Sequence, residues 1–310
     1  MTRQKGFRAF AREISINRYM YMLALPGILF FIVFCYLPMI GIVIAFQDFQ
    51  PLLGILGSPF VGFKNFEFFF TSANWKQVTI NTLYLNVIFI VTGTVATNVV
   101  AIILSEIVFN RYKRITQSLI ILPNFISWAV VAMFAVPLFS SDGGIINGIL
   151  TALNMRTVNF YTNSGIWPGL LTVIRLWKYA GFGSIVSLAI ITGIDPELYE
   201  AARIDGATRL KCIIHITIPH LKTIVIMQTI MAVGGIFYGD FGMIYAMVGD
   251  NPLLYPTIDV IDTFVYRMLR GSPNMGYPSA VGLYQSAVGF IMVLTANAVA
   301  KKFEPDSAIF

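Results

Sequence analysis

Six long apolar segments constrain this chain more than any other feature. A helix needs roughly 20 apolar residues to cross a hydrocarbon core of about 30 Å, because each residue adds about 1.5 Å. No ten-residue alternating pattern repeats, as it would in a membrane β-barrel. The sequence therefore predicts an all-α integral membrane protein with six transmembrane helices, at about 21–46, 80–104, 115–139, 166–191, 224–243 and 281–300.

Composition favours a membrane protein over a soluble one. Hydrophobic residues make up 57% of the 310 residues and charged residues 12%, whereas soluble domains carry about 25% charged residues. The two cysteines, Cys35 and Cys212, have no metal-like spacing, so we expect inert thiols. The net charge of +6 is explained by basic clusters beside apolar spans. Membrane lipid is therefore an expected partner and nucleic acid is not.

The positive charges predict an orientation, because short cytoplasmic loops hold an excess of lysine and arginine. Most of the 21 lysines and arginines lie before the first span, between the second and third, between the fourth and fifth, and after the sixth. We therefore expect both termini and segment 195–222 in the cytoplasm. Residues 1–17 are then a cytoplasmic tail, and 18–310 a single transmembrane domain whose first span is an uncleaved anchor.

Segment 195–222 carries charges of both signs in an otherwise apolar chain. Asp195 is a candidate N-cap, and Pro196 suits the first helical position. Gly206 can supply the left-handed residue that ends this helix. Thr208 can cap a second helix, which Pro219 is expected to end or kink. This helix–turn–helix is either a hairpin that lies on the membrane surface or a docking element for another protein.

The stretch EAARIDGATRLKCIIHITIPHLK in this segment resembles the EAA loop of permease subunits of bacterial binding-protein-dependent ABC importers. The phenylalanine often found in the second helix of that loop is Ile213 here, which keeps the apolar face. The matching positions are Glu200, Ala201, Ala202, Asp205, Gly206, Ala207, Ile216, Pro219 and Leu221. Further stretches look like sugar permeases, most of all the branch that handles oligosaccharides and polysaccharide fragments: VGFKNFEFFF, NTLYLN, LPNFISW, LWKYAGFGS, VIDTFVYR and AVGLYQSAVGFIMVLTANAVAKK.

The resemblance implies the type I ABC importer permease fold and a division of labour among several chains. Such an importer has two permeases, usually different, two copies of a cytoplasmic ATPase and an external solute-binding protein, in the bacterial cell membrane. ATP and Mg²⁺ bind the ATPase, so we expect this chain to bind no cofactor and to be no enzyme. It also has no GxxxxGK[ST] phosphate loop. The implied ATPase-coupling residues are Glu200, Ala201, Ala202, Asp205, Gly206, Ala207 and Pro219.

A metal site is not expected from the two histidines. His215 and His220 lie five residues apart in the coupling segment, and no third ligand has a fitting spacing. Because His215 also matches a residue common in the family's loop, we expect a packing or docking role.

Polar and aromatic residues within the spans are candidates for the substrate pathway. Arg175 and Lys178 lie three apart in the fourth span, on roughly one helical face, where an ionisable group is costly unless it has a function. They would contact sugar hydroxyls or the carboxylates of an acidic sugar such as a uronate. Alternatively they snorkel to the interface or pair with Asp240. The other candidates are Trp177, Tyr179, Tyr238, Asp240 and Asn124. For the aromatic residues the alternative is lipid contact or helix packing, and for Asn124 it is structural hydrogen bonding.

Two other kinds of transporter are alternatives. One is a permease of the same fold for another solute class, since the EAA loop by itself does not specify a sugar. The other is a self-sufficient secondary carrier, which usually shows inverted repeats and carboxylates at the membrane midplane. Neither feature is found in this sequence, so a subunit of a sugar importer is the favoured interpretation.

Overall fold

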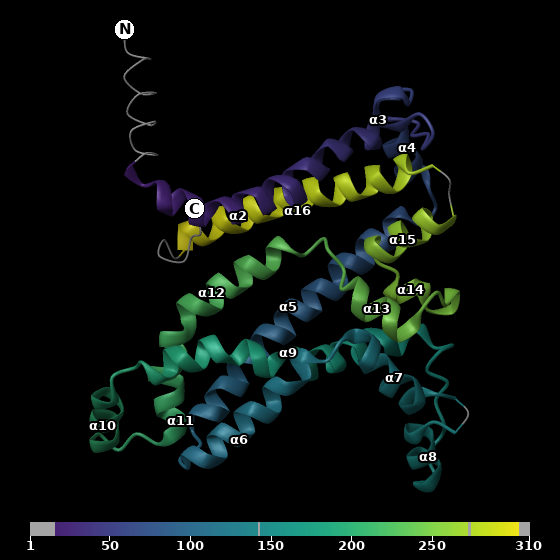
Figure 1. Cartoon of the computed structure of the whole chain (residues 1–310). Helices are drawn as coiled ribbons and strands as arrows, with labels where there is room; N and C mark the ends of the chain where they lie inside the picture. Colours follow the sequence, from purple (N-terminus) through teal and green to yellow (C-terminus); the bar gives the residue numbers. More distant parts are fainter. Residues whose placement is uncertain (1–15, 142, 272–273, 304–310) are drawn as a thin grey trace. The chain divides into compact units, whose positions relative to one another are not determined.

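The computed structural model describes residues 16–141, 143–271 and 274–303. These residues are mostly helical (Figure 1), and the strand-like pairing among them is an isolated antiparallel bridge between Gln47 and Phe60. The predicted all-helical fold is confirmed. The chain divides into two compact units, Met1–Phe69 with Ser272–Leu283 and Phe70–Gly271 with Tyr284–Phe310. That residues 18–310 form a single transmembrane domain stays a prediction.

The first unit contains one long apolar helical path. It runs through α2 (Arg18–Phe31), a π-helical turn (η1, Ile32–Tyr36) and a 3-10 segment (η2, Leu37–Phe46). Its 29 residues are enough to span a membrane. Asn65, in α4 (Lys64–Thr71), donates hydrogen bonds of 2.9 Å to the carbonyl oxygens of Ala45 and Gln47. This buried amide ties α4 to the end of the path, beyond the short α3 (Gly54–Gly57).

The second unit is organised around two long helices, α5 (Trp75–Ser105) and α9 (Trp167–Thr192), which pack along each other. Gly183 of α9 permits this approach, because a Cβ atom there would lie 2.9 Å from the hydroxyl oxygen of Thr97 in α5. Gly181 does the same for α6 (Asn110–Ile121), since a Cβ atom there would collide with the carbonyl group of Ile120. Large buried side chains fill the core at one end of the pair: Leu85, Phe89, Trp167, Leu171, Met243 and Ile244.

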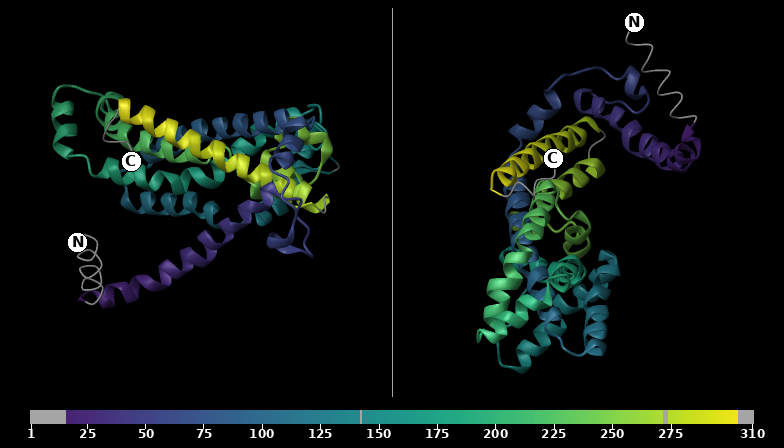
Figure 2. Two further views of the ribbon diagram at one scale, coloured as in Figure 1. Left: turned by 90° about the horizontal axis from the view of Figure 1, so that it is seen from above. Right: turned by 90° about the vertical axis from the view of Figure 1, so that its left-hand side faces the viewer.

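Further helices complete this unit, and some of the short ones lie at its two ends (Figure 1). α10 and α11 lie at one end and α13 and α14 at the other (Figures 1 and 2). The remaining helices are α7 (Trp128–Phe139), α8 (Ile145–Ala152), α10 (Pro196–Ile204), α11 (Arg209–Cys212), α12 (Ile218–Gly234), α13 (Phe241–Val248), α14 (Tyr255–Ile258), α15 (Ile261–Gly271) and α16 (Gly276–Phe303), the last of which runs through both units.

The predicted third span is broken. Five helical paths among the described residues are long and apolar enough to cross a membrane, and a sixth exists only if Asn110–Phe125 and Trp128–Phe139 are one span, bent by 95°. Pro123 removes a backbone donor near the bend, and Ser127 starts α7 as an N-cap that accepts a hydrogen bond from the Val130 N–H. The sequence LPNFIS therefore ends one helix and begins another.

The predicted fifth span, 224–243, is displaced along the chain. Its helical path begins at Arg209, passes through Pro219 and ends at Gly234. A π-helical turn (η5, Ile213–Thr217) precedes the proline, and the Ile218 N–H bonds to the Ile213 carbonyl oxygen five residues back. This wider turn accommodates the proline, which therefore does not end the helix. The residues after Gly234 leave the helix and form part of the site described next.

Candidate functional site

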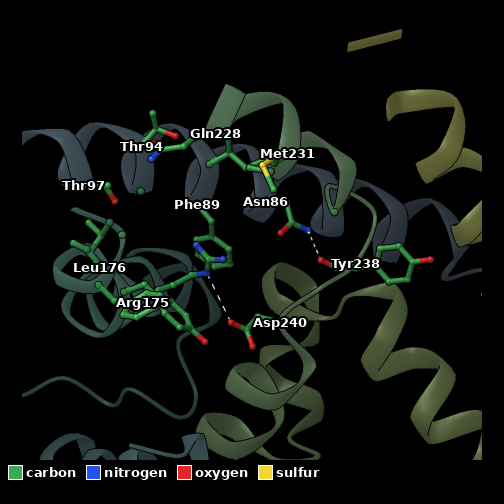
Figure 3. Close-up of a pocket in the computed structure, with 18 of the residues that line it drawn as sticks. Asn86, Phe89, Thr94, Thr97, Arg175, Leu176, Gln228, Met231, Tyr238 and Asp240 are labelled. Atoms are coloured by element: carbon green, nitrogen blue, oxygen red, sulfur yellow. Dashed lines mark hydrogen bonds and ion pairs between the residues drawn. The ribbon is translucent and has the colours of Figure 1, made fainter. Parts of the chain in front are cut away.

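A cavity of about 750 Å³ lies among the long helices of the second unit. Its walls come from α5, α9, α12 and the non-helical stretch before α13 (Figure 3). The side chains that line it are mainly apolar, but every wall carries at least one polar or charged group. The polar residues are Asn86, Thr94, Thr97, Arg175, Tyr179, Gln228, Tyr238 and Asp240.

Arg175 is the cation on the cavity wall. Its guanidinium carbon lies 5.0 Å from the ring centre of Phe89 and 5.4 Å from that of Tyr179, so two aromatic faces support it. Its Nε lies 3.8 Å from Oδ2 of Asp240, as the dashed line in Figure 3 shows. This separation is an ion pair and is longer than a hydrogen bond. Asp240 also caps α13, because its Oδ1 accepts a hydrogen bond from the Met243 N–H.

Side chains from other helices hold the backbone of the stretch between α12 and α13. The buried Asn86 amide of α5 donates to the carbonyl oxygens of Ile236 and Tyr238, at 2.9 and 3.2 Å. A second buried amide, Gln285 of α16, donates to the Phe237 carbonyl oxygen of the same stretch at 2.5 Å. We call Asn86, Gln285 and Asp262 the clasp of this stretch.

The third member of the clasp is Asp262 of α15. Its Oδ2 accepts hydrogen bonds from the Gly239 N–H at 2.6 Å and from the Gln285 amide at 3.1 Å. Non-helical backbone is tolerated at membrane depth only where its polar groups find protein partners or line a cavity. The clasp provides those partners, and it fixes Tyr238 and Asp240 on the cavity wall.

The predicted pathway residues divide into two groups. Arg175, Tyr179, Tyr238 and Asp240 line the cavity, whereas Trp177 faces an apolar pocket between α7 and α9. Arg175 and Lys178 both lie about 5.4 Å from the ring centre of Tyr179, as their shared helical face predicts, but of the two only Arg175 is among the residues that line the cavity.

Lys178 is buried and has its own partners. Its ammonium group donates to the carbonyl oxygens of Pro123 at 3.2 Å, of Asn124 at 3.0 Å and of Ile126. These carbonyls lie where the third span breaks, and that of Pro123 also accepts a hydrogen bond from the Ile126 N–H at 3.2 Å. Asn124 thus contributes its backbone to a structural contact with Lys178, and neither residue is among those that line the cavity.

Four polar residues of the cavity did not emerge from the sequence analysis. They are Asn86, Thr94 and Thr97 on α5 and Gln228 on α12. Thr94 and Thr97 follow Asn86 at helical spacings that keep them near one face, together with Gly93. This polar stripe in an otherwise apolar span was the signal that could have revealed them.

The EAA segment folds as the capping residues predicted. The Asp195 carboxylate accepts a hydrogen bond from the Glu197 N–H at 2.9 Å, and the Thr208 hydroxyl caps α11. Gly206 has φ of 78°. Its N–H bonds to the Arg203 carbonyl oxygen at 3.0 Å, and the Ala207 N–H bonds to the Ala202 carbonyl oxygen at 2.9 Å. These two bonds form a Schellman motif, which requires a left-handed residue at Gly206.

This hairpin presents an exposed surface at one end of the unit. Glu200, Ala201 and Asp205 are exposed, and so are Gly206 and Pro219. A groove of about 330 Å³ lies beside them, lined by Ala202, Ala207, Lys211, Cys212, His215 and Ile216. The coupling role of these residues stays a prediction, as does the orientation of the two termini.

The histidines have local partners. Nδ1 of His215 lies 3.0 Å from the Lys211 carbonyl oxygen, and Nδ1 of His220 lies 2.7 Å from that of Ile216. Across the residues that the structure describes, no three His, Cys, Asp or Glu side chains are grouped to hold a metal ion.

Comparisons with known proteins identify the family. The family model for the binding-protein-dependent transport system inner membrane component matches residues 97–304. The polygalacturonan/rhamnogalacturonan transport system permease protein YteP of Bacillus subtilis is 37% identical, over 93% of this chain and 89% of YteP. The LplB protein of the same organism is 34% identical, over 99% of this chain and 95% of its own length.

Solved structures agree with this result. A crystal structure of a bacterial ABC transporter involved in the import of the acidic polysaccharide alginate contains a chain that superposes with a TM-score of 0.87 at 31% identity, covering 96% of this chain and 99% of that one. The structural match extends over the cavity and the EAA hairpin, and the family match covers the hairpin and the part of the cavity from residue 97 onwards. The chain therefore belongs to the binding-protein-dependent transport system inner membrane components, the non-catalytic permease subunits of ABC transporters.

Proposed function

We propose that this chain is the permease subunit of an ATP-driven importer and that its cavity forms part of the pathway for an oligosaccharide. The observation that carries the proposal is the cavity itself, which gathers hydroxyl, amide and charged groups inside membrane-spanning helices. Such groups are costly in a membrane unless they serve a solute or pair with one another. Sugars present many hydroxyls that need donors and acceptors, so this wall suits them.

Relatives support a carbohydrate over other solutes. YteP is named for polygalacturonan and rhamnogalacturonan, and another relative, the AraP permease of Halalkalibacterium halodurans, for arabinooligosaccharides. The cavity of about 750 Å³ holds only a few sugar rings at once, and a second permease subunit would supply the rest of the pathway.

External delivery of the substrate is part of the proposal. An alginate ABC transporter whose chain resembles this one, with a TM-score of 0.85, was crystallised in complex with a periplasmic protein that holds an alginate pentasaccharide. We infer that a solute-binding protein likewise brings the oligosaccharide to this permease, on the side of the membrane opposite the EAA hairpin.

The EAA hairpin is the proposed contact with the ATPase, which binds ATP and Mg²⁺. Its exposed residues Glu200, Ala201 and Asp205 surround a backbone turn that Gly206 holds rigid. Tyr199 and Thr217 share a hydrogen bond of 3.0 Å between their hydroxyls, which joins α10 to the helical path that continues into α12. A displacement of α10 by the ATPase would therefore reach a helix of the cavity wall.

Reconstitution tests this function. The chain is assembled in proteoliposomes with its partner permease, ATPase and binding protein, and uptake of labelled oligosaccharides is measured with and without ATP. We expect uptake that requires ATP and the binding protein. Uptake without ATP would indicate a secondary carrier, and uptake of another solute class with no oligosaccharide uptake would refute the proposed substrate.

A further inference from the structure

Arg175 has hydrogen-bond donors that the protein does not use. Its guanidinium carries five N–H donors, and none of them has a hydrogen-bond acceptor among the residues that the structure describes. The carboxylate of Asp240 lies at ion-pair distance from the Nε atom of Arg175. A cation inside a membrane span normally finds partners, so these open donors point to an external ligand.

Lys178, three residues further along α9, is a cation whose hydrogen-bond donors all have partners in the protein. It is 4% exposed, and all three of its N–H donors meet carbonyl oxygens. Arg175 is 30% exposed and lines the cavity. Of the two cations of α9, only Arg175 is therefore available to a molecule in the cavity.

A glycine of α5 faces the guanidinium and places no side chain beside it. A Cβ atom on Gly93 of α5 would lie 3.9 Å from Nη1 of Arg175, with no other atom within 4 Å. The rings of Phe89 and Tyr179 support the guanidinium, which restricts its orientation. The edge formed by the two Nη atoms is thus accessible, while Asp240 occupies the Nε side.

The chemistry of this edge selects its ligand. A planar guanidinium binds a carboxylate through two parallel hydrogen bonds, and such charge-assisted pairs are stronger than bonds to neutral hydroxyls. Thr94, Thr97 and Gln228 line the same cavity, and their side chains form no hydrogen bonds with other residues that the structure describes. These groups match the hydroxyls of a sugar ring around a single carboxylate.

We propose that Arg175 is the receptor for a sugar carboxylate and that the oligosaccharide carried by this permease contains uronate residues. This inference rests on the proposed oligosaccharide pathway and specifies its charge. The carboxylate binds the Nη edge of Arg175, and Asp240 stays on the Nε side as the internal counter-ion. The hydroxyls of the same sugar ring bind the neutral polar groups of α5 and α12.

Direct binding to the assembled complex tests the inference without involving the binding protein. The probes are a galacturonate or mannuronate trisaccharide and the methyl ester of each, which keeps the sugar backbone and removes the charge. We expect the wild-type complex to bind at least one of the acids more tightly than its ester. Arg175→Gln should weaken binding of that acid by about tenfold or more and change ester binding little.

Two further variants complete the design. Arg156→Gln removes an exposed arginine outside the cavity and should bind both probes like wild type. Arg175→Lys keeps the charge but loses the bidentate geometry. We therefore expect its affinity for the acid to lie between the affinities of wild type and Arg175→Gln.

The failures of the inference and of the proposed function are distinguishable. Neutral trisaccharides that bind and are imported, while both acids fail, would overturn the carboxylate receptor and leave the oligosaccharide pathway intact. Equal losses for acid and ester in Arg175→Gln would also overturn it. A wild-type complex that neither binds nor imports any oligosaccharide refutes both proposals.

Discussion

The ammonium group of Lys178 lies 3.0 Å from the carbonyl oxygen of Asn124. Two residues that sequence analysis assigned to the substrate pathway are thus partners of each other, at the break between η3 (Leu122–Phe125) and α7. The C-terminal end of a helix attracts cations, and the ammonium group adds a donor for carbonyl oxygens at the end of η3, of which that of Pro123 also accepts from the Ile126 N–H at 3.2 Å. We infer that Lys178 is a structural residue that stabilises the bend of the third span.

Replacing Lys178 by methionine tests this role. The substitution keeps most of the apolar stem but removes the ammonium donor from the carbonyl oxygens of Asn124 and Ile126, and we expect the free energy of unfolding to fall by about 2 kcal/mol or more. Thermal unfolding of the purified complex in detergent measures the change. Lys76→Met, at an exposed position, is the control. Impaired transport with unchanged stability in Lys178→Met would assign it to the pathway instead.

The clasp makes a second prediction, for which the chain offers a matched pair. Asn86 donates across to Ile236 and Tyr238, whereas the Asn98 amide bonds only to the Thr94 carbonyl oxygen of its own helix. Both lie in α5. Asn86→Leu should therefore destabilise the protein by about 1–3 kcal/mol more than Asn98→Leu, because it strands carbonyls that no helix satisfies.

Unfolding midpoints of Asn86→Leu and Asn98→Leu, measured under the same conditions, test this difference in stability. We also expect Asn86→Leu to reduce oligosaccharide uptake, since the clasp fixes Tyr238 and Asp240 at the cavity. Equal stability of the two leucine variants would mean that the clasp contributes nothing to the stretch between α12 and α13.

Local features of this fold could be read from the sequence, and long-range ones could not. Asp195, Gly206 and Thr208 were predicted correctly because a cap depends on neighbours within a few residues. The end of α12 depends on Asn86, which lies 150 residues from its partner Ile236, and no local pattern reveals such a contact. Pro219 was expected to interrupt the helix, but the π-helical turn that accommodates it has no clear sequence signature.

The candidate site shows the same limit. Helical spacing placed Arg175 and Lys178 near each other on α9 but did not reveal which neighbour each one meets. That depends on the bend of the third span for Lys178 and on Phe89 of α5 for Arg175. The charge of both residues made them candidates, and only the tertiary structure shows that Arg175 lines the cavity while Lys178 is buried against backbone carbonyls.

A third prediction concerns the turn of the EAA hairpin. Gly206 has φ of 78° and open space around its Cα, so Gly206→Ala meets no clash and introduces only the backbone cost of a left-handed alanine, about 1–2 kcal/mol. We expect weaker coupling, seen as lower substrate-stimulated ATPase activity in the reconstituted complex. Gly206→Asn should retain more activity, because asparagine adopts this conformation more readily.

Membrane insertion and complex assembly are the controls for the turn variants. Unchanged ATPase stimulation in Gly206→Ala, together with unchanged stimulation in Glu200→Gln, would show that this hairpin does not couple the two subunits.

A fourth prediction uses the pH dependence of the clasp. Burial raises the pKa of the Asp262 carboxyl above its ordinary value, and hydrogen bonds from the Gly239 N–H and the Gln285 amide offset only part of that effect. Between the ordinary value near 4 and the raised one, the native state binds more protons at this site than the unfolded state. The contribution of Asp262 to stability is therefore greatest at low pH and decreases as pH rises through this window.

Asp262→Asn removes the titrating group while keeping an oxygen that can accept from the Gly239 N–H. We expect the variant to lose less stability than wild type as pH rises from about 4 towards neutral, which thermal unfolding at a series of pH values measures. Asp195→Asn is the matched control, because it neutralises an exposed aspartate and retains a good N-cap. A slope in Asp262→Asn as steep as in wild type and the control would exclude Asp262 as the source of the pH dependence.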